Sequence, residues 1–386
     1  MDSNIFLKNF NTKIKLNNKK KLIKYLKKIN SQNWPKFLDS YKKKYVYGYD
    51  KKFLKKFKNI QDINIIGMGG SSLGAKAIYN FLKDKIAKKF LFLENLNLKN
   101  KIQRNRLNVI ISKSGNTLET ITNFNTVYHP KNKNIFITES TNNYLNNLAG
   151  KLKSDVIEHK NFIGGRFSVL SEVGMLPAQL MGLKEHKFKQ YNNLIIKKNF
   201  INQLTQNVLC TYELIKKRKF NSVILNYDYK SNELFEWYKQ LVSESLGKKS
   251  KGIFPIISNM PKDNHSILQL YLDGFRSNFY TFFIVAEKNT SKINSKLLNK
   301  NFNFLKQKST FEILNAQKIA TEKIFIEKKI PFRSFFIKKR NEETLGKLFC
   351  FFTLEVILLS HLLKVNPLDQ PEVELVKKET FKILSN

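Results

Sequence analysis

Cysteine is scarce in this sequence, with only Cys210 and Cys350 among 386 residues. The two residues lie far apart in the chain, and each lies in an apolar stretch with helical spacing. This placement argues against a disulfide-rich scaffold and against a cysteine zinc site, because both need clustered cysteines. We therefore expect a protein of a reducing compartment, the cytoplasm.

Acidic side chains are also few, since 30 Asp and Glu stand against 69 Lys and Arg, a formal net charge of +39. Such a balance favours nucleic-acid binding only where the basic residues cluster. Here the lysines are spread from 19–21 through 42–44 to 338–340, among abundant Asn, Ile and Phe. We interpret them as solvated faces and expect no nucleic-acid partner, although the positive field can help to draw in an anionic substrate.

The sequence lacks a signal-peptide pattern and has one long apolar run. Its N-terminus, MDSNIFLKNF, has neither a basic start nor a continuous apolar core. The apolar run at 348–363 contains Glu355, Ser360 and His361 and is short for a membrane span. We expect a buried core helix at this position and no membrane partner.

The chain is long enough for two domains of ordinary size. Residues 1–58 are rich in lysine, with apolar residues at helical spacings, and predict an N-terminal helical segment. After residue 58, short β-branched runs alternate with helical patterns, which is typical of parallel sheets flanked by helices. The predicted strands are 63–66, 90–93, 109–111, 135–138 and 156–157 and, after a helical stretch at 188–219, 222–225, 254–257, 279–285 and 332–337.

The sequence therefore predicts an α/β fold with two such domains, at 59–187 and 188–365, and a C-terminal segment at 366–386. Ligands of open parallel sheets bind beyond the carboxyl ends of the strands. We therefore examined the polar residues that follow the predicted strands.

Two turns of this kind contain glycine and hydroxyl side chains. In IIGMGGSSLGA, at 65–75, a strand leads into a glycine turn and a helix. Its spacing is not that of a dinucleotide fingerprint, because Ser72 stands where the third glycine is needed. An anion site and a merely tight turn remain equally open there. In ISKSGNT, at 111–117, three hydroxyls and a glycine favour a phosphate nest, although a helix cap is the alternative.

Four further motifs contain residues suited to acid–base or anion chemistry. They are GGRFS with Arg166, QLVSESLGK with Glu244, DNHS with His265, and NPLDQPEVELVKK with Gln370 and Lys377. Taken singly, each has an ordinary explanation as a surface cation, a solvated helix end, a helix cap or one lysine among many.

In this order, the six motifs resemble those of the glucose-6-phosphate isomerase family from about residue 60 to the C-terminus. The resemblance implies two sugar-isomerase domains and a C-terminal helix, 366–386, that completes the active site. It also implies reversible conversion of glucose 6-phosphate to fructose 6-phosphate, without metal or cofactor. A homodimer is implied as well, in which His265 is contributed to the neighbouring subunit's site.

The resemblance gives each candidate residue a role. Glu244 is expected to move the proton between C2 and C1 through an enediol. Positioned acid–base catalysis of this kind contributes roughly 10²–10⁴-fold to the reaction rate. Arg166 is expected to face the enediolate oxygen, while His265 and Lys377 share the ring opening in roles that sequence leaves undivided. The expected substrate and phosphate ligands are Gly70, Ser71, Ser112, Lys113, Ser114, Thr117, Gly165, Gln240 and Gln370.

Two positions depart from the family pattern without removing a proposed catalytic side chain. Leu246 stands where many relatives have Asn, and Glu372 replaces a glycine. Two alternatives stay open at this point. One is a related isomerase that also accepts mannose 6-phosphate, and the other is a phosphosugar-binding regulator without catalysis. A regulator would need the two hydroxyl-rich turns but not the four catalytic side chains together.

Overall fold

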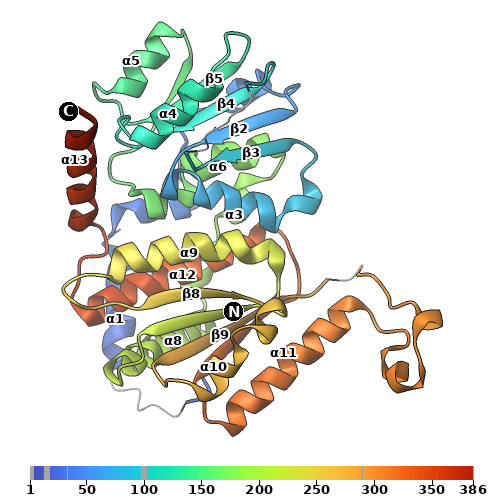
Figure 1. Ribbon diagram of the computed structural model, residues 1–386. Coiled ribbons are helices and arrows are strands. Elements are labelled where there is room, and N and C mark those ends of the chain that lie inside the picture. Colours follow the sequence, from blue (N-terminus) through green and yellow to red (C-terminus); the bar gives the residue numbers. More distant parts are fainter. Residues whose placement is uncertain (1–3, 13–17, 33, 97–101, 288–289, 386) are drawn as a thin grey trace.

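The computed structural model describes residues 4–12, 18–32, 34–96, 102–287 and 290–385. It has two five-stranded sheets that lie one above the other, with helices between them and around them (Figure 1). The predicted α/β class with two parallel sheets is therefore confirmed.

The first sheet is parallel throughout, in the order β3-β2-β4-β5-β6. Its strands are β2 (Asp62–Ile66), β3 (Lys89–Leu93), β4 (Leu107–Ile111), β5 (Lys133–Thr138) and β6 (Asp155–Glu158). The central strand β4 is buried at each of its positions, which explains its continuous apolar run. All five predicted strands of this half are present, each extended by one or two residues.

The second sheet has the order β1-β10-β9-β7-β8. Four of its strands match the predicted ones: β7 (Asn221–Asn226), β8 (Phe254–Asn259), β9 (Asn278–Val285) and β10 (Phe332–Ile337). These four pair in parallel, and β1 pairs antiparallel with β10 at the edge.

Strand β1 (Ile5–Lys8) corrects the expectation that residues 1–58 are helical. Its four residues alternate buried and exposed, with Ile5 and Leu7 facing the core. The alternation was hidden because the strand is short and a lysine-rich helical pattern follows it. That pattern forms α1 (Lys19–Ser31), which buries Leu22, Leu26 and Ile29.

The other α-helices surround and separate the sheets. They are α2 (Lys51–Lys55), α3 (Leu73–Phe81), α4 (Leu118–Val127), α5 (Tyr144–Lys151), α6 (Glu172–Leu180), α7 (Tyr191–Ile195), α8 (Lys198–Lys216), α9 (Asn232–Leu246), α10 (Leu268–Asp273), α11 (Thr310–Glu327), α12 (Glu342–Leu363) and α13 (Pro371–Ser385). Short 3₁₀ turns used below are η2 (Gly69–Ser71), η3 (Lys83–Lys85), η4 (Gly165–Leu170), η6 (Tyr229–Ser231) and η7 (Lys262–His265).

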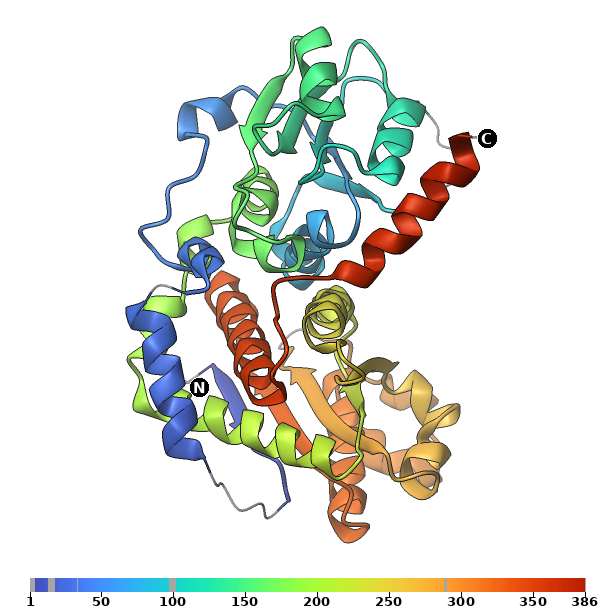
Figure 2. The ribbon, with the colours of Figure 1, turned by 90° about the vertical axis from the view of Figure 1, so that its left-hand side faces the viewer.

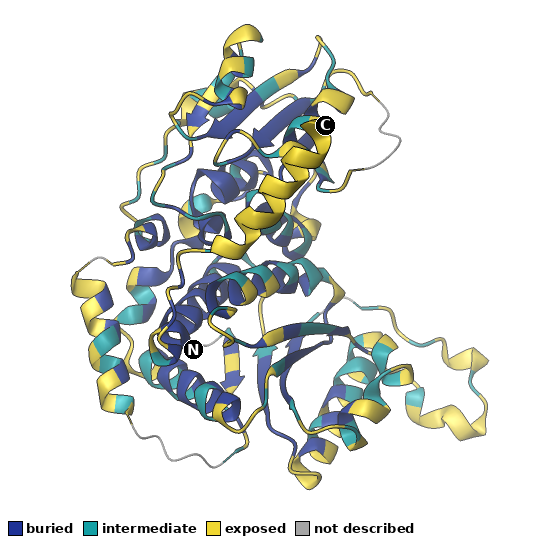
Figure 3. Cartoon of the chain, turned by 60° about the vertical axis from the view of Figure 1, so that its left-hand side comes forward, coloured by how far each residue is buried: buried dark blue, intermediate teal, exposed yellow. Residues whose placement is uncertain are grey.

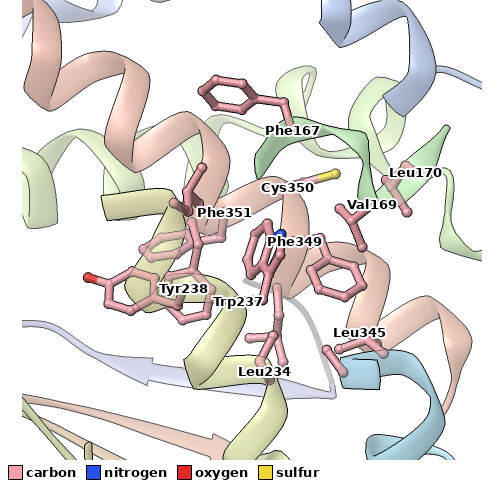
Figure 4. Packing of buried hydrophobic residues seen from close by; sticks show 14 of the residues in the cluster. Phe167, Val169, Leu170, Leu234, Trp237, Tyr238, Leu345, Phe349, Cys350 and Phe351 are labelled. Atoms are coloured by element: carbon pink, nitrogen blue, oxygen red, sulfur yellow. The ribbon is translucent and has the colours of Figure 1, made fainter. Parts of the chain in front are cut away.

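Helices α3 and α9 pack against each other between the two sheets, and α12 packs against α9 (Figures 1 and 2). Each of α3 and α9 follows the first parallel strand of its own sheet. The hydrophobic core continues across this junction, because Phe167 and Val169 join Trp237 of α9 and Phe349 of α12 in one cluster (Figure 4). The domain boundaries at 58/59, 187/188 and 365/366 stay predictions.

Helix α12 contains the long apolar run and is almost entirely buried. By length and composition it is the one helix among the described residues that could cross a membrane, but most of its apolar window is covered by the rest of the protein. It therefore has the burial expected of a core helix. Helix α13, in contrast, is exposed along its length and lies beside the first sheet (Figures 2 and 3).

Candidate active site

The glycine turn after β2 is the meeting point of three motifs. A Cβ on Gly70 would lie 2.1 Å from the carbonyl carbon of Gly165, so the two turns touch backbone to backbone. Gly69 has a left-handed φ of 53°, and its Cβ would lie 2.7 Å from Nε2 of Gln240. Only glycine allows these approaches. The turn therefore lies directly against both the GGRFS loop and α9.

The second hydroxyl turn, after β4, lies beside the first. A Cβ on Gly67 would be 3.0 Å from the carbonyl oxygen of Ile111, which immediately precedes Ser112. Ser112 Oγ is 2.7 Å from Thr117 Oγ1, while Ser114 is exposed. Lys113 donates from Nζ to the carbonyl oxygen of Asn161 at 2.7 Å. The hydroxyls predicted for phosphate binding thus follow a strand adjacent to the Ser71 turn.

Ser71 itself is half-buried, and its neighbour Ser72 is tied down. Ser72 Oγ donates to Oε1 of Glu94 at 2.7 Å, and Lys76 lies 2.5 Å from Oε2 of the same carboxylate. Glu94 follows β3, so it fixes the start of α3 from the neighbouring strand. The turn that presents Ser71 is therefore held rigidly on one side by an ion pair.

Arg166 is the most connected side chain of the site. It is 2% exposed, and its guanidinium uses all five N–H donors. The acceptors are Ser245 Oγ at 2.9 Å, Glu244 Oε2 at 3.0 Å, Gln370 Oε1, Pro367 O at 2.6 Å and Asp369 O at 3.0 Å. Burial lowers the pKa of Arg166, and the neighbouring Glu244 carboxylate opposes that shift. This side chain joins η4, α9 and the segment before α13.

Glu244 is held from two sides on the last turn of α9. Arg166 donates to Oε2, and Gln240 Nε2 donates to Oε1 at 2.9 Å. Gln240 and Glu244 are four residues apart, so they share one helix face. Oε1 of Gln240 is buried without a partner among the described residues, which leaves an acceptor for a ligand hydroxyl. The Glu244 side chain remains 23% exposed, so a ligand can reach it.

A cavity of about 800 Å³ opens at this end of α9. Its walls are formed by the end of α9, the turn at 247–251, the segment 365–370 and the start of α13, and they include Glu244 and Gln370. A space of this size accommodates a small-molecule ligand. Among the residues that the structure describes, no group of three or more His, Cys, Asp or Glu is placed to hold a metal ion.

Lys248 is a residue of the site that the sequence analysis did not single out. Its Nζ lies 2.9 Å from Oδ1 of Asp369 and also donates to the carbonyl oxygen of Asn366. The hydrogen bond from Lys248 holds the pKa of Asp369 below its usual value. Lys248 and Arg166 together anchor the segment that presents Gln370. The only signal in the sequence was its position four residues after Glu244.

Comparison with known proteins identifies the family of the chain. The sequence matches the phosphoglucose isomerase family over residues 51–386. The chain belongs to this family.

Relatives named glucose-6-phosphate isomerase support the assignment to the phosphoglucose isomerase family, and solved structures share the fold. The glucose-6-phosphate isomerase of Methanocaldococcus jannaschii is 31% identical over 86% of this chain and 87% of its own length. That of Mycoplasmopsis synoviae is 32% identical over 84% of this chain and 83% of its own. A Thermus thermophilus crystal structure, titled a hypothetical protein, has the same fold, with a TM-score of 0.82 and 22% identity over 95% of both chains.

The crystal structure of a Chlamydia trachomatis glucose-6-phosphate isomerase also shares the fold. Its TM-score is 0.67 at 19% identity, over 86% of this chain and 72% of that one. The family resemblance inferred from the six motifs is therefore confirmed.

Two residues expected in the site from the phosphoglucose isomerase resemblance lie outside the Arg166–Glu244 cluster. His265 is exposed at the end of η7, beyond β8. Its turn is shaped by Asp263, which accepts from Ser258 Oγ at 2.8 Å and from the backbone N–H of Asn259 at 2.7 Å. His265 does not line the cavity at Glu244.

Lys377 lies on exposed α13, with its Nζ 2.7 Å from Oε1 of Glu374. The cavity wall includes Glu372 and Val373 of that helix but not Lys377. The ring-opening roles of His265 and Lys377 therefore stay predictions.

The two departures from the phosphoglucose isomerase pattern have different surroundings. Leu246 is fully buried at the end of α9, in the main hydrophobic core. Glu372 is exposed in the first turn of α13, where a carboxylate is electrostatically favourable. Neither residue contacts Arg166 or Glu244 through a hydrogen bond among the described residues.

Proposed function

We propose that the protein catalyses the reversible interconversion of glucose 6-phosphate and fructose 6-phosphate. The observation that carries this proposal is the Glu244 carboxylate, held between buried Arg166 and Gln240 at the wall of a cavity. Membership of the phosphoglucose isomerase family and relatives named glucose-6-phosphate isomerase support it. Neither the mannose 6-phosphate variant nor the non-catalytic regulator is favoured by any of these observations.

Glu244 is the proposed base. Isomerisation moves a proton from C2 to C1 while the carbonyl moves the other way, and one carboxylate between the two carbons can do both steps. The fixed hydrogen bonds from Arg166 and Gln240 orient the carboxylate before the substrate arrives. Preorganised geometry of this kind lowers the barrier without reorganisation during the reaction.

Arg166 is proposed to stabilise the enediolate. Because four of its five acceptors are neutral, its positive charge is only partly compensated by Glu244. Gln370 shares Nη1 with Glu244, so it can release this bond and turn its amide to a sugar hydroxyl. Loss of such a preorganised cation costs about 3 kcal/mol of transition-state stabilisation.

The phosphate is proposed to bind at the paired turns after β2 and β4. Ser71, Ser112, Ser114 and Thr117 supply hydroxyls, and the turns supply backbone N–H groups at the start of α3 and α4. Lys113, Gly70 and Gly165 complete this set. Gln240 and Gln370 would then orient the sugar hydroxyls near Glu244.

A coupled assay of isomerase activity tests the proposal directly. Glu244→Gln should lower kcat by roughly 10²–10⁴-fold, because it removes the base but keeps an acceptor for Arg166. Fructose 6-phosphate binding should persist. The matched control is Glu236→Gln, on the same helix, where the carboxylate pairs only with Lys239 at the surface. Full activity in Glu244→Gln, or an inactive wild-type protein with EDTA present, would reject the proposal.

We also infer a cytoplasmic homodimer in which His265 serves the neighbouring subunit's site. Its support is that His265 is exposed and lies away from the Glu244 cavity of its own chain. Mixing Glu244→Gln with His265→Asn protein, after dissociation and reassociation, gives mixed dimers with one complete site each. Because about half of the dimers are mixed, about a quarter of the wild-type activity should return. If His265 served its own subunit, no activity would return.

A further inference from the structure

The two sheets share one strand order. Reading from β3, the first sheet runs β3-β2-β4-β5, and reading from β8, the second runs β8-β7-β9-β10. Among these four strands of each sheet, the chain enters at the second, moves outward to the first, and then crosses back to the third. The strands β2 and β4 of the first sheet therefore correspond to β7 and β9 of the second.

This order creates a switch point in each sheet, between β2 and β4 and between β7 and β9. Connections leave such a point in opposite directions, so a crevice forms beyond the carboxyl ends of the two strands, where ligands bind. In the first sheet the corresponding place lies between the Ser71 and Ser112 turns already described. In the second sheet the same place contains a separate cavity of about 470 Å³.

This second cavity has apolar walls and a few polar groups. Tyr227 and Val285, at the ends of β7 and β9, form its floor, and Phe311 and Leu314 of α11 form one side. The polar groups of the lining are Asp228, Lys230, Glu287, Thr290, Thr310 and Gln317. Apolar walls with a small number of converging polar groups are typical of ligand sites.

The charged groups of the cavity form a network that favours neutral ligands over anions. Arg340 binds Asp228 at 2.7 Å and Glu287 at 2.6 Å, while Lys230 binds Asp84 of η3 at 2.6 Å. Among the described residues, three carboxylates thus face two cations in this network, in a chain whose overall charge is +39. A phosphate would meet an excess of negative charge here, in contrast to the hydroxyl turns of the first sheet.

Several hydrogen-bonding atoms of the lining are left for a ligand. Arg340 and Lys230 both approach Oε1 of Glu287, so Oε2 has no partner among the described residues. Within the described part of the chain, the side-chain amide of Gln317 and the hydroxyl of Thr310 also have no hydrogen-bond partner. A carboxylate oxygen and an amide can accept from neighbouring hydroxyls, and the amide can also donate.

We propose that this cavity binds a nucleoside without a phosphate group. The carboxylate of Glu287 and the amide of Gln317 accept from the two ribose hydroxyls, and the base packs between Phe311, Leu314 and the exposed ring of Tyr229. A carboxylate at a strand end that binds ribose hydroxyls is a recurrent solution in doubly wound sheets. The site is separate from the Glu244 cavity and does not depend on the isomerase function.

Isothermal titration calorimetry of the full chain with adenosine tests this site. We expect a Kd of about 1 mM or lower, unchanged by saturating fructose 6-phosphate, because the sugar phosphate occupies the other crevice. AMP should bind no more tightly than adenosine, and glucose, which has hydroxyls but no base, should bind more weakly. Absence of adenosine binding, competition by fructose 6-phosphate, or much tighter binding of AMP would overturn the proposal.

Variants locate the site. Glu287→Gln and Gln317→Leu should each weaken adenosine binding about tenfold or more, because the first replaces a charged acceptor by a neutral one and the second removes a hydrogen bond. The control is Glu327→Gln, at the exposed end of α11 outside the cavity. Gln317→Leu leaves the Arg340 ion pairs intact, so it separates lost binding from lost folding. Equal weakening in the control, or wild-type affinity in both pocket variants, would contradict the assignment.

Discussion

Arg166 and Arg333 are equally buried, at 2% exposure, but their surroundings differ. Arg333, on β10, forms two hydrogen bonds to Glu355 of α12, and that carboxylate is buried as well. Burial is the largest single influence and lowers the pKa of Arg333, but the attraction and hydrogen bonds of Glu355 and Tyr238 together raise it above its ordinary value. Burial lowers the pKa of Arg166, and the attraction of Glu244, a partly exposed carboxylate, and of Asp369 offsets this only in part.

The difference separates a cation neutralised within the core from the cation that we propose to be catalytic. The charge of Arg333 is neutralised by Glu355 inside the core, so it is not available to stabilise a ligand. At Arg166 the geometry is fixed by five hydrogen bonds while much of the charge stays uncompensated. A buried cation in that state is stabilised further when a negative charge develops beside it, as in an enediolate.

Removing the structural arginine should have the largest effect on stability. Arg333→Met leaves Glu355 as an uncompensated buried charge, and we expect a loss of about 3–5 kcal/mol in the free energy of unfolding. Urea denaturation followed by circular dichroism measures it. The folded variant should keep the wild-type kcat/KM, since Arg333 lies in the second sheet and not at the cavity of Glu244.

The control for this change is the double variant Arg333→Met with Glu355→Leu. Replacing both partners by apolar side chains should recover most of the lost stability, because no buried charge remains. If the double variant is as unstable as the single one, the loss arises from packing and not from the ion pair.

Replacing Arg166, the proposed catalytic arginine, should act on the reaction instead. Arg166→Lys keeps a positive charge but loses the planar fork that holds Glu244, Gln370 and the carbonyls of 367–369 at once. We expect kcat/KM to fall by about 10²–10³-fold, as for other preorganised donors. Steady-state kinetics measure this, with Arg276→Lys, an exposed arginine, as the matched control. Wild-type kinetics in Arg166→Lys would remove the distinction between the two arginines.

Gly70 extends the comparison of the two arginines, because its close contact with the GGRFS loop determines where Arg166 lies. Its added Cβ would be 2.6 Å from the backbone nitrogen of Arg166 and 2.1 Å from the carbonyl carbon of Gly165. Gly70→Ala should therefore cost about 1–3 kcal/mol in the free energy of unfolding, through overpacking. The control is Gly165→Ala, whose Cβ meets its nearest neighbour at an ordinary 3.7 Å. Equal destabilisation by both substitutions would mean that the close approach is not the cause.

The sequence was sufficient for most of the fold, because the buried parallel strands are continuous apolar runs and the helices between them have a clear period. Strand β1 was missed, since four alternating residues before a lysine-rich helix have too little signal of their own. The turns around Ser71 and Ser112 and the residues Arg166 and Glu244 were identifiable from their motifs. Their contacts were not, because Arg166 meets carbonyl oxygens about two hundred positions away in the chain.

The positions of His265 and Lys377 relative to Glu244 could not be predicted from the sequence, for a related reason. Both lie on exposed segments, η7 and α13, where no burial pattern in the sequence fixes their position relative to Glu244. Lys248 was overlooked because its role is to bind the segment 366–369, which depends on a long-range approach. Residue type and order thus predicted the family better than the geometry of the site.

Lys189 extends the comparison to a buried cation with no carboxylate in contact. Its Nζ donates to the carbonyl oxygens of Ser40 and Leu170, and it faces the rings of Tyr45 and Tyr47. Burial is the largest influence and lowers the pKa of Lys189 to about 7, against the opposing attraction of Glu172 and Glu185. If a buried cation needs a carboxylate in contact to keep its ordinary pKa, as the comparison of the two arginines indicates, this lysine should lose its proton near neutral pH in the folded protein.

The unfolded chain keeps that proton up to the ordinary lysine pKa of about 10.4. Between pH 7 and that value the unfolded state therefore binds more protons, and the free energy of unfolding rises with pH. We expect a gain of about 1 kcal/mol between pH 7 and pH 8 that is absent in Lys189→Met. Urea denaturation of the wild-type protein and of Lys189→Met at the two pH values measures this gain. Subtracting the change in the variant removes the contribution of the other titrating groups. A pH dependence shared by both proteins would show that Lys189 stays protonated, and that carbonyl oxygens alone can hold a buried cation as firmly as Glu355 holds Arg333.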